Sequence, residues 1–451
     1  MRTTAVILAA GQGTRMHSTL PKVLHPLLGR PLVHYAVETA RRVTGTKPVV
    51  VVGHGAEAVR RALGDAADSV LQEPQLGTGH AVLQAEPLLR DQVDQVLVTY
   101  ADMPLLSVET IGHLVDAQQA HSGPITLLTA VMEDPHGFGR VLRGPDGYVQ
   151  AIVEEAQAGP EILAIQEQNA GVYCFSASWL WEALRRIPLS PKGEYYLTDL
   201  VALAVADGFS VQAFGIADPT ETIGINTRVH LAEAEALLRQ RINRQWMLAG
   251  VTLIDPSSTY IEHGVQIGQD TTIWPNTFLQ GNTTIGEGCT LGPNTIVQDT
   301  QVGNGCRVLA SVLEKAVLED HVEMGPFGHL RKGAHLAQGV HLGNFGEVKN
   351  SYLGPGTKMG HFSYIGDANI GPEVNIGAGT ITCNYSMDGK KSPTEIGRGA
   401  FIGSDTMLVA PVKIGEGAAT GSGAVVTKNV PAYTLAVGVP ARAIRKLERR
   451  D

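Results

Sequence analysis

Residues 261–297 read IEHGVQIGQDTTIWPNTFLQGNTTIGEGCTLGPNTIV, and aliphatic residues recur there at every sixth position. The recurring positions are Ile261, Ile267, Ile273, Leu279, Ile285, Leu291 and Val297. A period of six cannot keep one face of an α-helix apolar, whereas a coil of short strands stacks each aliphatic residue on its counterpart one turn later. Glycine follows many of these positions and eases the corners of such a coil. The stretch therefore predicts an all-β C-terminal half built as a β-helix.

The same rhythm continues toward the C-terminus in blocks that are separated by slips and gaps. Later positions are Val302 and Val308; then Leu353, Met359, Ile365, Ile370 and Ile376; then Ile396, Ile402, Leu408, Ile414, Thr420 and Val426. This repeat resembles the hexapeptide-repeat acyltransferases. The resemblance implies a left-handed parallel β-helix of triangular section, assembly as a trimer, and an acyl donor bound between neighbouring coils.

Upstream of about residue 227 the sequence alternates expected strands with expected helices, which predicts an α/β domain with a mostly parallel, Rossmann-like sheet. The expected strands include 49–52, 96–98 and 125–128, and the expected helices include 32–42 and 108–119. Ligands of such a sheet bind beyond the carboxyl ends of its strands. We expect three parts: an α/β domain at 1–227, a connecting helix at 228–250 that stops at Gly250, and the β-helix at 251–451.

Composition excludes several classes of protein. The chain has 451 residues, a formal net charge of −9 and no basic block of the kind that binds nucleic acid. It has no apolar run of about 18 residues, so we expect no membrane insertion. Arg2 leads directly into a short strand pattern rather than a signal peptide, and none of the four cysteines forms a Cys-x-x-Cys motif. A cytoplasmic enzyme with reduced thiols is expected.

A glycine loop follows the first strand pattern. Residues 8–16 read LAAGQGTRM, and Lys22 follows Pro21. Backbone amides in such a loop can approach a polyphosphate closely, and Arg15 and Lys22 can neutralise its charge. A dinucleotide loop would require glycine at Met16, and a P-loop would require Gly-Lys-Ser/Thr. A plain strand-to-helix turn with a solvated arginine is the remaining alternative.

The loop resembles the signature of sugar-nucleotide pyrophosphorylases, and the two halves together resemble the bacterial bifunctional enzymes that make UDP-N-acetylglucosamine. The resemblance implies that the C-terminal half acetylates glucosamine 1-phosphate with acetyl-CoA. It also implies that the N-terminal half transfers UMP from UTP to N-acetylglucosamine 1-phosphate, with Mg²⁺, and releases pyrophosphate. The rival hypothesis is a single-activity nucleotidyltransferase whose β-helix only oligomerises.

In the N-terminal half the resemblance assigns catalysis to Lys22 and Arg15 and Mg²⁺ to Asp102 and Asn226. A carboxylate at the end of a buried strand suits Mg²⁺, with a helix N-cap as the alternative for Asp102. The implied UTP and UDP-N-acetylglucosamine contacts are Leu8, Ala9, Ala10, Gly11, Lys22, Gln72, Gly77, Thr78, Tyr100, Asp102, Gly139, Glu154, Asn169, Thr198 and Asn226. Gln72, Gly77 and Thr78 would read the base, or form only a glycine turn before a helix. Gly139, Glu154, Asn169 and Thr198 would hold the sugar, or be ordinary turn and surface residues.

In the C-terminal half the resemblance makes His361 the base that deprotonates the attacking amine, and a purely structural histidine is the alternative. The implied sugar-phosphate contacts are Arg331, Lys349, Tyr364, Asn375 and Lys391. The implied acetyl-CoA contacts are Ala378, Asn384, Tyr385, Ser404, Ser422 and Arg442.

The chain departs from the family at two places. Ser386 and Met387 are inserted before Asp388, so either Lys390 or Lys391 could correspond to the lysine of the family. Counting back from Thr394 favours Lys391. Gly438 stands where some members carry a basic residue.

Two cysteines share one position of the repeat. Cys289 and Cys306 each lie two residues before an aliphatic position. We expect them to stack in adjacent turns about 4.8 Å apart, as reduced thiols rather than a disulfide.

Overall fold

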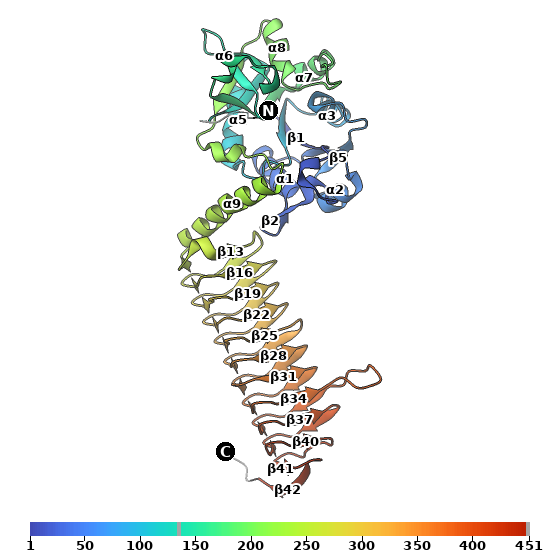
Figure 1. Cartoon of the computed structure of the whole chain (residues 1–451), viewed down its shortest axis with the longest axis vertical. Coiled ribbons are helices and arrows are strands. Elements are labelled where there is room, and N and C mark those ends of the chain that lie inside the picture. Colours follow the sequence, from blue (N-terminus) through green and yellow to red (C-terminus); the bar gives the residue numbers. More distant parts are fainter. Residues whose placement is uncertain (133–136, 448–451) are drawn as a thin grey trace. The chain divides into compact units, whose positions relative to one another are not determined.

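A computed structural model describes residues 1–132 and 137–447. Contacts divide the chain into two compact units, Met1–Leu237 and Leu238–Asp451 (Figure 1). The division falls inside one long helix, α9 (Arg228–Leu248), where the sequence predicts the connector. Among the described residues, none of the helices combines the length and the apolarity needed to cross a membrane.

The N-terminal unit is built on one sheet with the strand order β11-β7-β10-β6-β1-β4-β5. Its strands are β1 Thr3–Ala9, β4 Val49–Val52, β5 Asp68–Leu71, β6 Gln95–Tyr100, β7 Ile125–Val131, β10 Glu167–Ser176 and β11 Val211–Gly215. Neighbours are parallel except β10, which runs antiparallel to both β6 and β7. Two antiparallel hairpins accompany the sheet: β8 Arg140–Arg143 with β9 Val149–Val153, and β2 Pro26–Leu27 with β3 Arg30–Pro31. The predicted mostly parallel α/β fold is confirmed.

Helices cover both faces of this sheet because its central strands are apolar on both sides. In β1, Val6 and Leu8 belong to one core with α3, α7 and α8, while Ala5 and Ile7 belong to a second core with α1, α2 and α5. The helices are α1 Leu32–Thr44, α2 Ala56–Leu63, α3 Thr78–Leu83, α4 Glu86–Leu89, α5 Val108–Ala120, α6 Pro160–Leu163, α7 Ala177–Leu184 and α8 Asp199–Ala206. The carboxyl ends of β1 and β6 lie side by side, since Leu8 pairs with Tyr100.

The C-terminal unit is a left-handed parallel β-helix whose three sides are three sheets. The first sheet contains β12 Thr252–Leu253, β15 Thr272–Ile273, β18 Thr290–Leu291, β21 Arg307–Val308, β24 Glu323–Met324, β27 His341–Leu342, β30 Lys358–Met359, β33 Asn375–Ile376, β36 Phe401–Ile402, β39 Ala419–Thr420, β41 Thr434–Val437 and β42 Arg442–Lys446. The second contains β13 Thr259–Ile261, β16 Thr277–Gln280, β19 Ile296–Gln298, β22 Val312–Glu314, β25 His329–Leu330, β28 Gly346–Lys349, β31 Ser363–Gly366, β34 Ile381–Cys383, β37 Met407–Val409 and β40 Val425–Val426. The third contains β14 Gln266–Ile267, β17 Thr284–Ile285, β20 Gln301–Val302, β23 Val317–Leu318, β26 Ala334–Leu336, β29 Ser351–Leu353, β32 Ala368–Ile370, β35 Thr394–Ile396 and β38 Val412–Ile414. Only β42 runs antiparallel to its neighbour among these described strands.

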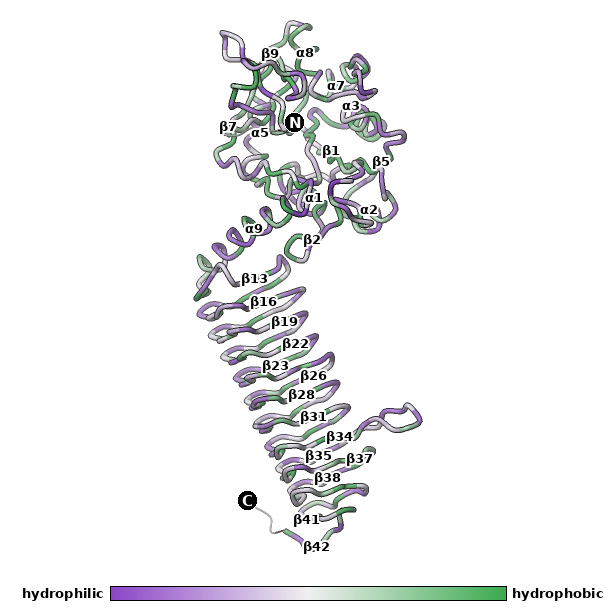
Figure 2. Tube along the Cα trace, in the orientation of Figure 1, coloured by the Kyte–Doolittle hydropathy of each residue, from purple (hydrophilic) through white to green (hydrophobic). Residues whose placement is uncertain are grey.

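Each turn of the coil places the repeated aliphatic residues inside, and Figure 2 shows hydrophobic and hydrophilic residues alternating along the turns. The sequence predicts a gap between Val308 and Leu353, and this expectation is wrong. The coil continues there with buried Leu313, Leu318, Met324, Leu330, Leu336, Leu342 and Val348. These positions were missed because two consecutive spacings, from Val308 to Leu313 and from Leu313 to Leu318, are five residues instead of six.

The backbone conformation at the corners of the coil explains why the six-residue spacing sometimes shortens to five. Where two inward residues are five apart, the residue two after the first one has a left-handed backbone: Asp299, Ala310, Lys315, Asn350 and Asp367, with φ between 41° and 51°. Where they are six apart, the left-handed residue lies three after the first one, as at Asp270, Asn276, Asn294 and His321. A left-handed residue therefore turns most corners of the coil, and in the five shortened turns it lies one position earlier than in most six-residue turns. Gly281, two residues after Leu279 in a six-residue turn, is an exception.

One segment leaves the coil between β34 and β35 as an arm (residues 384–393; Figure 1). Its stem is an antiparallel bridge between Tyr385 and Lys391. The inserted Ser386 and Met387 lie beyond that bridge, so the extra length lengthens the arm and leaves the coil in register.

Cys289 and Cys306 stack as predicted, because Leu291 pairs with Val308 in adjacent turns. Both thiols are buried, and neither forms a disulfide. Cys289 Sγ donates to Gly303 O at 3.1 Å, and Cys306 Sγ donates to a carbonyl in the next turn. Both therefore serve as polar packing at an inner corner.

Candidate active sites

A cleft of about 940 Å³ opens at the carboxyl ends of β1 and β6. Ten residues predicted to contact the nucleotide line it: Leu8, Ala9, Ala10, Gly11, Lys22, Gln72, Gly77, Thr78, Tyr100 and Asp102. They come from three segments that are far apart in the sequence, 8–22, 72–78 and 100–102. The parallel sheet brings these segments to one edge, as expected for an α/β fold.

The glycine loop is shaped around the stem of Lys22. Gly13 has φ of 63°, and a Cβ atom there would lie 2.6 Å from Cβ of Lys22. Gly11 faces open space, so its backbone is accessible from the cleft. Met16, where a dinucleotide loop would have glycine, is buried in the core.

Lys22 joins the two residues predicted to bind the metal. Its ammonium group donates to Asp102 Oδ2 and, at 3.0 Å, to Asn226 Oδ1. Asn226 is held nearby because Ile225 N donates to Asp102 O at 2.8 Å. One carboxylate and one amide oxygen drawn to a single cation fit a hard divalent ion that keeps other bonds to water and phosphate. The described residues hold no cluster of three or more His, Cys, Asp or Glu side chains that could bind a metal by themselves.

Arg15 is not brought to this cluster. It lies in a short 3₁₀ turn, Thr14–Met16, where its side chain is exposed, and it is absent from the residues that line the cleft. The prediction that Arg15 and Lys22 act at one place therefore requires movement of the loop.

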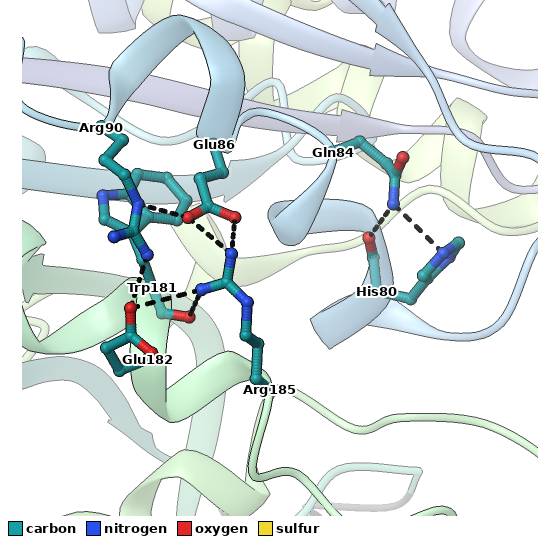
Figure 3. Close-up of polar contacts among 7 residues, drawn as sticks. All are labelled: His80, Gln84, Glu86, Arg90, Trp181, Glu182 and Arg185. Atoms are coloured by element: carbon teal, nitrogen blue, oxygen red, sulfur yellow. Dashed lines mark hydrogen bonds and ion pairs between the residues drawn. The ribbon is translucent and has the colours of Figure 1, made fainter.

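Hydrogen bonds and close packing hold the loop at 72–78, which is predicted to read the base. Gln72 is buried and donates from Nε2 to Gly77 O at 2.9 Å, beside His80 Nδ1 at 3.2 Å. Gln84 reaches the other side of the same histidine (Figure 3). Burial lowers the pKa of His80, so the neutral ring is favoured. At Gly77, φ is 96° and a Cβ atom would meet Tyr195 O at 2.6 Å, which only glycine avoids.

An ion-pair cluster supports the helices behind this loop (Figure 3). Arg185 contacts Glu86 at 2.7 Å, and Arg90 contacts Glu182 at 2.7 Å. These contacts tie α4 to α7.

The sequence reading missed Gln75. Its Nε2 donates to Ala10 O at 2.6 Å and so links the base-reading loop to the glycine loop. Gly53 makes room for this contact, because a Cβ atom there would lie 2.6 Å from Gln75 Nε2 and 2.7 Å from Ala10 O. Sequence alone carries no signal for it beyond the proximity of Gln75 to Gln72.

A second cleft of about 780 Å³ adjoins the first, and Thr78 and Tyr100 line both. Its lining includes Glu154, Asn169 and Thr198, as predicted for the sugar. Gly139 lies beside it: a Cβ atom there would be 3.7 Å from Glu154 Oε1.

Hydrogen bonds hold the polar groups of this second cleft. Thr198 Oγ1 donates to Glu154 Oε1 at 3.4 Å, and Asn169 Nδ2 donates to Tyr173 Oη at 2.7 Å. Burial raises the pKa of Glu154, and burial beside Asp102 and Glu154 raises that of Tyr100. Lys192, which sequence reading missed, also lines this cleft.

In the β-helix, three of the predicted sugar-phosphate residues share the second sheet. Arg331 follows β25, Lys349 ends β28 and Tyr364 lies in β31, on successive turns. Arg331 is paired with Glu347 at 2.8 Å. Gly366 leaves space for the Tyr364 phenol, which a Cβ atom would meet. The coil therefore lines up two cations and a phenol on one side.

His361 occupies the adjoining edge. It lies exposed at the corner between β30 and β31, two residues after inward Met359. Ala378, Ser404 and Ser422 hold the same position in later turns, so the predicted acetyl-CoA residues continue the edge that begins with His361. Asn375 lies on β33, in the first sheet, on the far side of that edge from Tyr364.

The arm carries the remaining predicted contacts. Asn384 donates to Asp367 Oδ2 at 2.5 Å and anchors the arm to the coil. Lys391 lies in the stem opposite Tyr385, whereas Lys390 is paired with Asp388 at 3.3 Å beyond it. Arg442 is exposed in β42, after the turn at Gly438.

Comparisons with known proteins follow the same division. Residues 5–197 match the model of the MobA-like NTP transferase domain. Residues 393–428 match the bacterial transferase hexapeptide model, and residues 282–312 match the hexapeptide repeat of succinyl-transferase.

Curated relatives match nearly the whole chain. The bifunctional protein GlmU of Heliobacterium modesticaldum is 48% identical over 96% of this chain and 95% of its own length. The chain belongs to the bifunctional GlmU family. The GlmU proteins of Desulfitobacterium hafniense and Shouchella clausii are 47% and 45% identical over the same shares of each chain.

Family membership confirms the reading of two activities. The chain is a bifunctional transferase of UDP-N-acetylglucosamine biosynthesis, with a uridyltransferase and a hexapeptide acetyltransferase in one polypeptide. It uses nucleotide-sugar and acetyl-CoA substrates, and its nucleotidyltransferase half belongs to a class that uses a divalent metal. The rival reading of a single-activity enzyme is wrong.

Proposed function

We propose that the N-terminal unit transfers UMP from UTP to N-acetylglucosamine 1-phosphate and releases pyrophosphate. The observation that supports this most directly is the pair of adjoining clefts that share Thr78 and Tyr100. One cleft has the glycine loop and the base-reading loop, and the other has buried polar groups suited to a sugar. The two substrates would meet at the shared wall.

Charge neutralisation and positioning dominate this step, because the attacking sugar phosphate is already an anion and needs no general base. Lys22 contacts the phosphates from the cleft, and Arg15 joins it when the glycine loop moves. Asp102 and Asn226 would hold Mg²⁺, which when bound would further neutralise the phosphate oxygens. Gln72, Gly77 and Thr78 hold the base.

The sugar in the second cleft is held by Glu154, Asn169 and Thr198, with Gly139 giving close backbone approach. The buried carboxyl of Glu154 and the amide of Asn169 offer an acceptor and a donor to sugar hydroxyls and to the acetamido group. Such paired groups reject analogues that leave them without a partner.

The C-terminal unit transfers the acetyl group from acetyl-CoA to glucosamine 1-phosphate. His361 accepts the proton of the attacking amine. Arg331 and Lys349 bind the phosphate, with Tyr364 beside them. Acetyl-CoA lies along the edge formed by Ala378, Ser404 and Ser422, and Asn384, Tyr385 and Arg442 contact its remainder.

A homotrimer completes this second site. The edge that carries His361 also exposes Phe327, Phe345 and Phe362, each more than half exposed, and the first two rings stack at 5.3 Å. Asn375 lies on the first sheet of the coil, and Lys391 lies in the stem of the arm. Packing of three coils would cover the aromatic rings and bring these residues to His361 of a neighbouring subunit. The magnesium-dependent enzyme would act in the cytoplasm, where UTP and acetyl-CoA are made.

Two assays on the full chain test these proposals together. Thiol release from acetyl-CoA with glucosamine 1-phosphate measures the first reaction, and pyrophosphate release from UTP with N-acetylglucosamine 1-phosphate measures the second. We expect the second to require Mg²⁺ and the first not to. Light scattering tests the trimer, and a fully acetylating monomer would contradict it.

A further inference from the structure

The ammonium group of Lys22 holds the same two oxygens that we assign to the metal. It bonds to Asp102 Oδ2 and to Asn226 Oδ1, and the side chains of Lys22 and Asp102 are only 13% and 17% exposed. This inference rests on the proposed metal role of Asp102 and Asn226.

Two cations cannot share these oxygens. Mg²⁺ binds oxygen ligands at about 2.0–2.1 Å, so an ion bound to both side chains would lie between them, where the ammonium now lies. The two positive charges would also repel each other at short range in a largely buried setting. Metal and ammonium are therefore alternatives at this place.

The lysine head is the part that can move. The backbone bond from Ile225 N to Asp102 O ties the segments of Asp102 and Asn226 together, and the Lys22 stem is packed against Gly13. Lys22 also lines the nucleotide cleft, so its head can turn toward a phosphate without displacing the stem.

We propose that Lys22 keeps the metal site closed until nucleotide binds. In the free enzyme its ammonium group is the counter-ion of Asp102. When phosphate oxygens enter the cleft, the ammonium bonds to them instead and leaves Asp102 and Asn226 to the metal. The enzyme then binds free divalent ions weakly and takes up metal together with nucleotide.

Binding of Mn²⁺ alone to the full chain, without nucleotide, tests this directly by electron paramagnetic resonance. Lys22→Met keeps the length of the stem and removes the charge. We expect it to bind free Mn²⁺ about ten-fold more tightly than wild type. In the variant no ammonium group occupies the oxygens of Asp102 and Asn226, so the ion does not have to displace one. Lys22→Arg retains the charge and should bind Mn²⁺ as weakly as wild type.

A matched control separates competition for the site from a general change of charge. Arg15→Met removes one positive charge from the same loop but does not touch Asp102, so Mn²⁺ affinity should change by less than about two-fold. Thermal unfolding of each variant checks that it is folded. Unchanged Mn²⁺ affinity in folded Lys22→Met, or an equal gain in Arg15→Met, overturns the proposal.

The metal assignment has its own test, which separates the two failures. If Asp102→Ala retains wild-type uridyl transfer and metal dependence, the proposed metal site is wrong and this inference falls with it. If Asp102→Ala is inactive while Lys22→Met binds Mn²⁺ as wild type does, the site is right and only the closing role of Lys22 is wrong.

Discussion

The two catalytic regions are built in opposite ways. The nucleotide cleft gathers distant segments of the chain at one sheet edge and encloses its charged groups: Lys22 and Asp102 are 13% and 17% exposed. The acetyl-transfer region arises from local repetition, which places Arg331, Lys349 and Tyr364 on successive turns. His361, the proposed base, is exposed on an edge of the coil. A folded sheet encloses residues from distant segments inside one chain, whereas a regular coil presents its repeated residues on an outer surface.

Removing His361 should give the largest loss and should leave the other region untouched. His361→Ala is expected to lower acetyl transfer by roughly 10²–10⁴-fold, because the attacking amine loses its base. Steady-state thiol release measures the loss, and pyrophosphate release should stay normal. His341→Ala, another exposed coil histidine, is the matched control. Near-normal turnover with an unchanged pH profile would make His361 structural.

The converse change tests the enclosed site. Asp102→Ala should lower uridyl transfer by about 10³-fold, since it removes the carboxylate proposed to hold Mg²⁺ beside the phosphates. Acetyl transfer in the same preparation should remain within about two-fold of wild type. A parallel loss of both activities would show that the two regions are coupled rather than independent.

The arm offers a paired comparison within the acetyl-transfer region. Lys391→Ala should reduce acetyl transfer about ten-fold, through loss of one charge-assisted contact to substrate. Lys390→Ala should change it by less than about two-fold, because that side chain is already paired with Asp388 near the tip. The reverse order would assign the family lysine to position 390.

Gln75 tests whether the loops of the enclosed site depend on one another. Gln75→Leu removes the hydrogen bond to Ala10 O and should raise KM for UTP about five- to ten-fold, with a smaller change in kcat. Acetyl transfer by the same protein is the internal control. An unchanged KM would mean that the glycine loop holds its position without this link.

The smallest expected effect concerns the coil alone. Lys315 turns a five-residue corner with φ of 51°, so Lys315→Gly should stabilise the β-helix by about 1 kcal/mol. Gly281→Ala, at φ of 64° on the same edge, should destabilise it by at least as much. Thermal unfolding measures both. If both substitutions changed the unfolding temperature equally and in the same direction, the corner conformation would not depend on the residue at that position.

The strands at 49–52 and 125–128, the helices beginning at Leu32 and Val108, and the inward aliphatic positions could all be predicted from the sequence. Each depends on neighbours in the chain: a buried run, a helical period or a repeat of six. The interrupted stretch between Val308 and Leu353 could not, because two short corners in succession imitate irregular sequence.

The sequence by itself determined the two architectures and, through resemblance, part of the lining of the two clefts. Only the tertiary structure decided that Lys22 bridges Asp102 and Asn226 and that Gln75 holds Ala10. It also decided that Arg15 is exposed outside the lining of the cleft, and that His361 lies between the sheets of Asn375 and Tyr364. The physical reason is the distance along the chain over which each kind of interaction acts. Periodicity and turn chemistry act over a few residues, whereas these contacts join segments that meet only after the sheet and the coil have formed.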